Sequence, residues 1–265
     1  MGGGCGAEGV TLGPAAAFVG SRVASLEDGA EYTPGGIMSQ LEERCGGVTN
    51  PEIAMWETRF GGEDYLFGTD PNAFLVRSTP RIPDQGRILA VADGEGRNGV
   101  WLAEQGFAVH SVEGSERAVA KAQRLARERG VRLVDSLAEL APGALFAEVG
   151  DVLHYPWPQR SYDAVVAIFI QFAKPGVERE SMFAAMIQSL KTDGVLLLEG
   201  YTPRQLEFGT GGPKAVEHMY TEDFLRDVFS GMRIDAIDAY DAELDEGAQH
   251  SGMSAVIDLT ATKIR

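Results

Sequence analysis

Cysteine and histidine are scarce in this chain, and these residue types most often bind metals or act as nucleophiles and bases. The 265 residues include 2 cysteines and 4 histidines. Both cysteines, Cys5 and Cys45, precede the part of the chain with regular strand and helix patterns. The histidines lie far apart, without the spacing of zinc ligands. We therefore expect no disulfide framework, no metal site, and a reducing compartment, the cytoplasm.

Long apolar runs and an excess of positive charge are also missing. No apolar run reaches the roughly 20 residues that a membrane span needs. The formal net charge is −16, which disfavours a nucleic-acid backbone or an anionic membrane as a partner. We interpret the charge mainly as a source of solubility. With 44% hydrophobic residues, the chain can bury one sizeable core.

The N-terminal segment differs from the remainder in texture. Residues 1–47 contain twelve glycines and little periodicity, which predicts a flexible or weakly structured extension with one short helix at Ile37–Arg44. Acids such as Glu8 and Glu27 argue against an organelle transit peptide, although targeting by this extension stays an alternative. One domain is predicted over residues 48–265.

From residue 50 onward, short apolar runs alternate with amphipathic stretches. The predicted strands are 88–91, 107–112, 131–134, 164–170 and 195–199, and segment 146–149 is ambiguous between strand and loop. The predicted helices are 51–60, 115–130, 181–190 and 221–229, with a further helix from an Asp70 cap and Pro71 to Ser78. A helical pattern also passes through Val100, Leu102 and Ala103, and 136–140 predicts a helical turn or a short helix. The alternating segments 232–244 and 253–263 predict an antiparallel hairpin. Together they predict an α/β fold: a doubly wound, mostly parallel seven-stranded sheet with that hairpin at its C-terminal end.

The stretch Arg87–Lys121 carries the clearest functional pattern. An apolar strand leads into Gly94-Glu-Gly96-Arg-Asn-Gly99, a helix follows, and the next strand ends at Glu113. A glycine-rich turn before a helix lets backbone N–H groups approach a ligand. An acid at the tip of the next strand can accept hydrogen bonds from ribose hydroxyls. The pattern therefore predicts a nucleoside-containing cofactor.

Two nucleoside cofactors fit this pattern, and three features distinguish them. The charge of Asp93 lies inside the turn, where it would oppose a dinucleotide pyrophosphate. Asp151 lies where the fourth strand should end, and its carboxylate could accept a hydrogen bond from an adenine amine. A terminal hairpin is not what a second mononucleotide-binding half would supply. These features favour S-adenosylmethionine, a sulfonium cation, and leave an NAD-dependent oxidoreductase as an alternative.

The motif Ala92-Asp-Gly-Glu-Gly-Arg-Asn98 resembles the glycine loop of class I methyltransferases that use S-adenosylmethionine. Within that class, the chain is most similar to the tellurite-resistance and thiopurine methyltransferase-like group of small-molecule enzymes. The resemblance covers roughly residues 50–265 and includes Tyr65–Leu75, Leu198–Pro203 and Gly209–Pro213. It implies a Rossmann-like methyltransferase fold, an enzyme of the EC 2.1.1 type, and S-adenosylhomocysteine as product.

The resemblance also implies roles for individual residues. The candidate cofactor-binding residues are Trp56, Asp93, Gly94, Gly96, Arg97, Asn98, Glu113, Gly114, Ser115, Asp151, Val152, Ile168 and Phe169. Glu113 would bind the ribose hydroxyls and Asp151 the adenine amine. Tyr201, Tyr65 and Gln171 are the candidates for positioning the acceptor, and the loop Gly209–Pro213 should lie over it.

The missing catalytic sets constrain the acceptor. No Ser/His/Asp set, Cys/His pair or metal cluster is apparent in the sequence. A soft nucleophile needs no strong base, because positioning and exclusion of water can supply most of the rate. We therefore expect a small acceptor with a thiol, thioether or chalcogen nucleophile. A non-catalytic scaffold or sensor that binds S-adenosylmethionine is the alternative, and the sequence does not distinguish a monomer from a homodimer.

Overall fold

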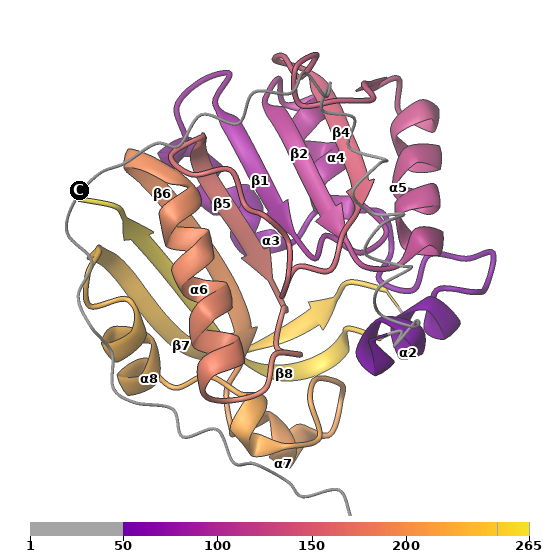
Figure 1. Ribbon diagram of the computed structural model, residues 1–265. Coiled ribbons are helices and arrows are strands. Elements are labelled where there is room, and N and C mark those ends of the chain that lie inside the picture. The colour runs from indigo at the N-terminus through magenta and orange to yellow at the C-terminus, as the bar shows by residue number, and fades with distance from the viewer. Residues whose placement is uncertain (1–49, 248, 265) are drawn as a thin grey trace, which may run out of the picture. The chain divides into compact units, whose positions relative to one another are not determined.

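An eight-stranded mixed sheet forms the centre of the part of the chain that the structure describes (Figure 1). The structure is a computed structural model, and it describes residues 50–247 and 249–264. The extension predicted over residues 1–47, including its short helix, lies outside these residues. The strand order is β3-β4-β2-β1-β5-β6-β8-β7. Strands β1 to β6 pair in parallel, whereas β8 pairs antiparallel with both β6 and β7.

The bounds of the elements follow the alternation expected for a doubly wound fold. The strands are β1 Arg87–Val91, β2 Ala108–Glu113, β3 Arg132–Leu133, β4 Ala144–Val149, β5 Tyr162–Ile168, β6 Leu190–Tyr201, β7 Arg233–Asp245 and β8 Ser251–Thr262. The α-helices are α2 Pro51–Arg59, α3 Ala73–Ser78, α4 Arg97–Glu104, α5 Glu116–Glu128, α6 Val177–Ser189, α7 Gln205–Phe208 and α8 Glu222–Val228.

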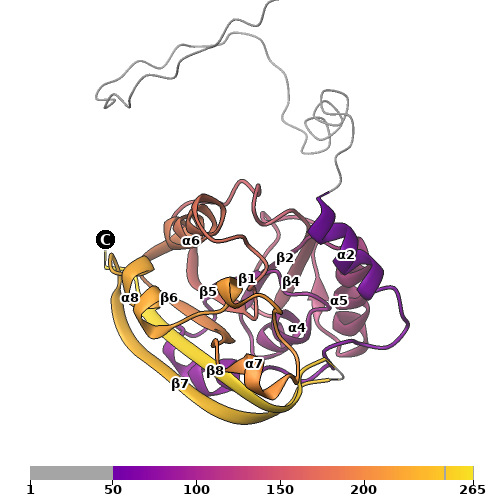
Figure 2. The same ribbon diagram turned by 90° about the horizontal axis from the view of Figure 1, so that it is seen from below.

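Helices cover both faces of the sheet because successive strand residues point to opposite sides. Along β1, Ile88 belongs to the core that α3, α4 and α5 cover. Its neighbour Leu89 belongs to the core that α6 and α8 cover. Figures 1 and 2 both place α4 and α6 on opposite faces of the sheet. The near-continuous apolar runs of the sequence are thus strands buried on both faces.

The predicted α/β fold with a terminal antiparallel hairpin is confirmed, with one strand more than expected. The extra strand is β4, the segment whose sequence was ambiguous. Two polar or exposed residues, Glu148 and Val149, end its apolar run, but it pairs with β2 along its whole length. The hairpin of β7 and β8 pairs from Arg233 with Thr262 to Asp245 with Ser251.

Several predicted element bounds were wrong. Helix α3 begins at Ala73 with Asn72 as its cap, rather than at Pro71, because the Asn72 side chain accepts a hydrogen bond from Leu75 N at 2.9 Å. Helix α6 begins at Val177, four residues before the predicted start at Ser181. Of the two structures predicted for residues 136–140, the shorter is present, since residues 137–139 form a turn.

Within the described residues, no helix is long and apolar enough to cross a membrane. Over the same residues, no group of three or more His, Cys, Asp or Glu side chains could hold a metal ion.

Candidate functional site

A pocket opens where the strand order reverses. Strand β1 lies between β2 and β5, and the chain winds outward from it in both directions. Ligands of doubly wound sheets bind in the crevice that this reversal leaves at the carboxyl ends of the strands. The pocket here encloses about 1060 Å³ between atoms, part of it open to solvent. Its walls come from the ends of β1, β2 and β5, the loop after β4, helix α2 and the β7–β8 turn.

The glycine loop between β1 and α4 has two structural tasks. Gly94 has a φ of 58° and lines the pocket, where a backbone without a Cβ leaves room for a ligand. Gly96 also has positive φ, but a Cβ there would lie 2.5 Å from the Cβ of Ala122 in α5. Gly96 does not line the pocket. It allows helices α4 and α5 to approach closely, so the structure assigns it a packing role where cofactor binding was predicted.

Asp93 points inward and caps helix α4. Its carboxylate accepts hydrogen bonds from Gly99 N at 3.2 Å and from the Ser111 hydroxyl at 3.1 Å. Burial raises the pKa of Asp93 to about 7, against the lowering effect of those hydrogen bonds. The side chain therefore shapes the loop from behind. A group with this pKa is only partly charged at neutral pH. Asp93 would therefore repel a pyrophosphate in the turn less strongly than predicted from the sequence.

Glu113 connects the second strand to the glycine loop. One carboxylate oxygen accepts from Gly94 N at 3.1 Å and the other from Ser115 N at 2.9 Å. The residue is 8% exposed and lines the pocket. Because a carboxylate offers about four acceptor positions, Glu113 keeps capacity for hydroxyl donors of a ligand. Burial raises the pKa of Glu113, and the backbone donors oppose that rise.

Arg97 brings a buried positive charge to the pocket. Its Nη2 lies 2.7 Å from a carboxylate oxygen of Glu246 in the turn between β7 and β8. Its Nη1 is buried without a hydrogen-bond partner among the described residues. The neighbouring Asn98 also lines the pocket, but its side-chain oxygen accepts from Asn72 N at 2.9 Å. Arg97 is thus available to an anionic ligand group, whereas Asn98 fixes the segment before α3.

Asp151 and Val152 close the pocket beyond β4. Asp151 accepts hydrogen bonds from Leu153 N at 3.0 Å, His154 at 2.9 Å and the Asn50 side chain at 3.2 Å. Burial alone would raise the pKa of Asp151, but these partners lower it below its ordinary value. The carboxylate is therefore charged at neutral pH and can accept from an amine. Asn50 also caps helix α2, so the same contact fixes the helix that covers the pocket.

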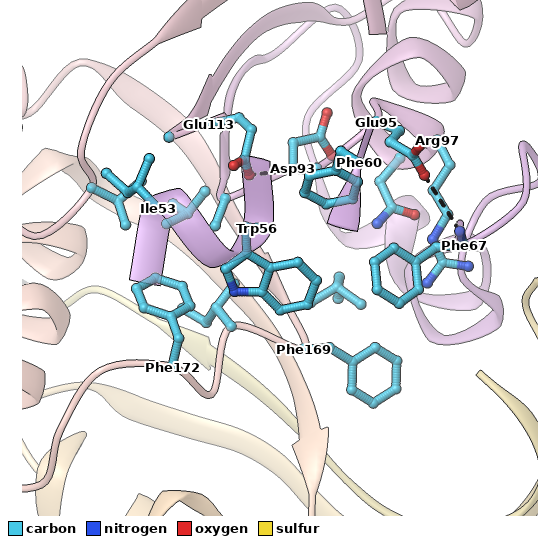
Figure 3. Close-up of a pocket in the computed structure, with 18 of the residues that line it drawn as sticks. Ile53, Trp56, Phe60, Phe67, Asp93, Glu95, Arg97, Glu113, Phe169 and Phe172 are labelled. Atoms are coloured by element: carbon cyan, nitrogen blue, oxygen red, sulfur yellow. Dashed lines mark hydrogen bonds between the residues drawn. The ribbon is translucent and has the colours of Figure 1, made fainter. Parts of the chain in front are cut away.

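Aromatic rings form one side of the pocket. Figure 3 shows Asp93, Glu95 and Glu113 along one edge and the rings of Phe169 and Phe172 along the other, with Trp56 of α2 between them. The Trp56 ring stacks on Phe60 at 5.4 Å and lies 6.1 Å from Phe67. We call Trp56, Phe60, Phe67, Phe169 and Phe172 the aromatic wall. Figure 1 shows α2 near the carboxyl ends of β2 and β4, and Trp56 of this helix lines the pocket.

The end of β5 is strained at the pocket. Phe169 follows Ile168 directly and has a φ of 57°, which is uncommon for a bulky residue. Its ring lies 4.4 Å from the ring of His250, which also packs against Phe67 at 4.6 Å. His250 lines the pocket and is 8% exposed. The turn of the β7–β8 hairpin thus places the His250 imidazole next to the aromatic wall.

The structure brings most of the predicted cofactor residues together. Those that line the pocket are Trp56, Asp93, Gly94, Arg97, Asn98, Glu113, Gly114, Asp151, Val152, Ile168 and Phe169. Ser115 does not line it, because its hydroxyl caps α5 by accepting from Ala118 N at 3.1 Å. The roles of the lining residues stay predictions.

The three residues predicted to position an acceptor do not line the pocket. The Tyr65 hydroxyl donates to Lys121 O at 3.2 Å, on the outer side of α5. The Gln171 side chain bonds to the backbone N and O of Tyr201 at 2.6 and 2.9 Å. Tyr201 itself is 1% exposed and lies behind Phe169, with ring centroids 4.6 Å apart. The loop at Gly212 packs against Tyr201 and also stays outside the lining. These positions favour structural roles.

Sequence reasoning missed several pocket residues. Glu95 has no role predicted from the sequence, and its carboxylate accepts from Leu66 N at 2.6 Å and Lys121 Nζ at 2.7 Å. These contacts fix the segment that carries Phe67. The aromatic spacing of Trp56 and Phe60 at i and i+4 was a usable signal for one helix face. No sequence pattern marks His250 as a pocket residue, because only the folded hairpin brings it near Arg97.

Comparison with known proteins supports the same cofactor. Residues 88–194 match the family model described as a methyltransferase domain, and this match favours S-adenosylmethionine over NAD. No curated protein matches the chain in sequence. A solved structure from work on the conversion of a disulfide bond into a thioacetal group in echinomycin biosynthesis has a TM-score of 0.64 at 18% identity, over 80% of this chain and 92% of that one.

Two further solved structures have the same fold. A SAM-dependent methyltransferase from Methanosarcina mazei has a TM-score of 0.56 at 18% identity, over 74% of this chain and 99% of its own. TehB from Haemophilus influenzae has a TM-score of 0.56 at 16% identity, over 72% of this chain and 62% of its own. At such identities the likeness establishes the fold alone.

The residues present fit this cofactor. The unpartnered Nη1 of Arg97 suits the methionine carboxylate, and the spare acceptor positions of Glu113 suit the ribose hydroxyls. The charged Asp151 suits the adenine amine, and the rings of the aromatic wall attract a sulfonium cation. Residues 88–194 thus match a methyltransferase domain, the described chain shares its fold with solved methyltransferases, and S-adenosylmethionine is the cofactor that the match supports.

Proposed function

We propose that this protein transfers the methyl group of S-adenosylmethionine to a small molecule with a soft nucleophile: a thiol, a thioether or another chalcogen species. The observation that carries the proposal is the aromatic wall, because five rings line the pocket beside the glycine loop. Sulfur makes favourable contacts with aromatic rings, and its polarisable electrons tolerate an apolar setting. A strongly hydrated or charged acceptor would lose its hydration there without gaining equivalent partners.

The arrangement can catalyse by positioning and by excluding water. Helix α2 contributes Ile53, Trp56 and nearby Phe60 to the pocket. It is held by Asn50 to Asp151 and by Glu57 to the Ser115 hydroxyl. A covered pocket favours displacement at a methyl carbon, since an aligned nucleophile in a dry site needs little further assistance.

Other considerations agree with this acceptor class. The sequence resembles the tellurite-resistance and thiopurine methyltransferase-like group, and the proposal includes membership of that group. The solved structure from echinomycin biosynthesis concerns a disulfide converted to a thioacetal, so this fold can accommodate sulfur chemistry. The pocket extends from the glycine loop to the rings of Phe169 and Phe172 and to His250, and this apolar end offers a place for a small acceptor beside the cofactor.

A screen for methyl transfer tests the proposal. Purified protein with S-adenosylmethionine would be offered thiols, thioethers, selenols, halides, phenols and amines, and S-adenosylhomocysteine release would be measured. We expect turnover with members of the sulfur or selenium set, and mass spectrometry should place the new methyl on that atom. Methylation confined to oxygen or nitrogen would contradict the acceptor class. Tight binding of S-adenosylmethionine without turnover on any acceptor would favour the non-catalytic scaffold.

A further inference from the structure

His250 is a buried, polar side chain in the apolar part of the pocket. It is 8% exposed and lies among the rings of Phe67, Phe169 and Tyr201, at centroid distances of 4.6, 4.4 and 5.8 Å. Its Nδ1 is buried without a hydrogen-bond partner among the described residues. A polar atom in this setting is costly unless it serves a purpose, so the placement of this imidazole calls for a functional account.

The carboxylate of Glu246 orients the imidazole. A Glu246 oxygen lies 3.9 Å from His250 Nδ1, which is too long for a hydrogen bond but close enough to favour a proton on that nitrogen. Glu246 is fixed in turn, because it accepts from Arg97 at 2.7 Å and from the Asn72 side chain at 3.0 Å. With the proton on Nδ1, the Nε2 atom is left as an acceptor.

The charges around His250 keep it neutral. Burial lowers the pKa of His250, and the nearby cations Arg97 and Arg59 lower it further, whereas Glu246 opposes them. Tyr201 also faces the ring, and burial raises the pKa of its phenol, so it adds no charge. Burial alone would raise the pKa of Glu246, but His250, Arg97 and Asn72 lower it to about 2. At neutral pH the ring is therefore able to accept a proton.

Accordingly, we infer that His250 is the general base for an acceptor thiol with an apolar or aromatic substituent, a conclusion that rests on the proposed function. An imidazole of ordinary or lowered pKa can deprotonate a thiol, whose pKa is about 8.5, far more readily than an aliphatic hydroxyl. Rings of the aromatic wall would hold the substituent. This assignment selects thiols over thioethers, because a thioether has no proton to give.

The chemistry balances with the groups named. When bound, S-adenosylmethionine supplies an electrophilic methyl on a sulfonium sulfur. The acceptor thiol loses its proton to Nε2 of His250, and its sulfur forms the new bond to the methyl carbon. The bond between the methyl and the sulfonium breaks, and its electron pair stays on the departing sulfur as a neutral thioether. His250 later releases the proton to water.

His250→Gln tests the inference. His218→Gln is the matched histidine control, because His218 ends the 3-10 helix Val216–His218 and does not line the pocket. The probes are benzyl mercaptan, which has a proton to lose, and benzyl methyl sulfide, which has none. For the thiol at pH 7, we expect kcat to fall about 100-fold in His250→Gln with little change in KM. The loss should shrink as pH rises and the free thiol ionises. The ratio of thiol to thioether rates should fall at least tenfold, and His218→Gln should change neither.

A binding measurement gives a readout without turnover. With S-adenosylhomocysteine present, 15N NMR of the unchanged protein should show one histidine Nε2 resonance that shifts when benzyl mercaptan binds and not when benzyl methyl sulfide binds, because only the thiol can donate a hydrogen bond to Nε2. His250→Gln should lose that resonance shift and His218→Gln should keep it.

Equal loss of thiol and thioether methylation in His250→Gln, or an unchanged thiol rate, would overturn the role of His250 while the proposed function stands. Failure of the unchanged protein to methylate any sulfur acceptor would instead contradict the proposed function.

Discussion

Among single residues, Asp93 and Glu113 divide the support of the glycine loop between them. Asp93 accepts from Gly99 N behind the loop, and Glu113 accepts from Gly94 N on the pocket side. Both residues line the pocket, and Glu113, whose carboxylate oxygens each accept one backbone N–H, keeps acceptor positions for ligand donors. We therefore expect Asp93 to maintain the loop conformation and Glu113 to bind the ligand.

Asp93 should make the stability of the protein depend on pH. Its pKa rises from an ordinary value of 3.8 to about 7 on folding, mainly through burial. Between these values the folded state holds a proton that the unfolded state has released, so stability falls as pH rises from about 4 to 7. Asp93→Asn cannot ionise and should lose this slope, which amounts to about 1.4 kcal/mol per unit of raised pKa.

Urea unfolding at several pH values between 4 and 8 measures this effect. The difference in unfolding free energy between Asp93→Asn and the unchanged protein should move in favour of the variant as pH rises. The control Asp84→Asn, at an exposed position, should leave the pH dependence of the unfolding free energy unchanged. A constant difference across the range would show that Asp93 is already ionised in the folded state at low pH.

Individual site residues were predictable where local sequence carries the signal. Glu113 and Gly94 follow from the strand, turn and helix pattern, and the structure places both at the pocket. Tyr201 and Gln171 were chosen for their chemistry, but the sequence does not show that Phe169 stands between Tyr201 and the pocket. His250 was set aside for lack of spacing, because its neighbours Phe67, Arg97 and Phe169 are distant in sequence.

Among the elements, the junction of β6 with β8 is the least typical, since two acids face each other there. Glu199 lies opposite Asp258 in the register, and they are 2% and 5% exposed. Asn72 donates to Glu199, and Arg77 pairs with Asp258. Burial, and then the charge of Asp258, raise the pKa of Glu199 well above its ordinary value. This direction favours a proton on Glu199, shared with the facing carboxyl of Asp258.

Glu199→Gln should therefore be well tolerated. An amide reproduces a protonated carboxyl, because it can donate to Asp258 and accept from Asn72, so we expect unfolding free energy within about 1 kcal/mol of the unchanged protein at pH 7. Glu199→Ala leaves both partners unsatisfied next to a cavity and should cost about 2–4 kcal/mol. Chemical denaturation of both variants decides the matter. Equal destabilisation by Gln and Ala would mean that Glu199 is ionised.

Elements with strong periodicity were predicted well, and those set by distant partners were not. The alternating patterns of residues 232–244 and 253–263 predict the hairpin, although only β7 keeps exposed positions along its length and β8 is buried on both faces from Ser254 onward. The start of α3 depends on Asn72, whose backbone N–H is held by Asn98 at 2.9 Å, and local sequence favoured Asp70. The first turn of α6 carries an exposed Val177 among charged residues, so no apolar stripe marks it.

Across the whole described chain, the sheet topology assembles the pocket from distant segments. Asn50 caps helix α2 and Trp56 lies within it, Glu113 ends the second strand, and His250 lies in the turn of the terminal hairpin. Each contributes little alone, and the reversal of strand order beside β1 brings them to one crevice. The fold thus explains why the glycine loop by itself left the cofactor open, and why the hairpin matters for the acceptor.

The central claim is that this crevice binds S-adenosylmethionine through Glu113, and calorimetric titration of the cofactor tests it most directly. Glu113→Ala should weaken binding about 100-fold, or about 2.7 kcal/mol, because ribose hydroxyls lose hydrogen bonds to a charged acceptor. The control Glu116→Ala removes an exposed acid three residues away and should bind as the unchanged protein does. Undiminished affinity in Glu113→Ala, or no binding by the unchanged protein, would contradict the account.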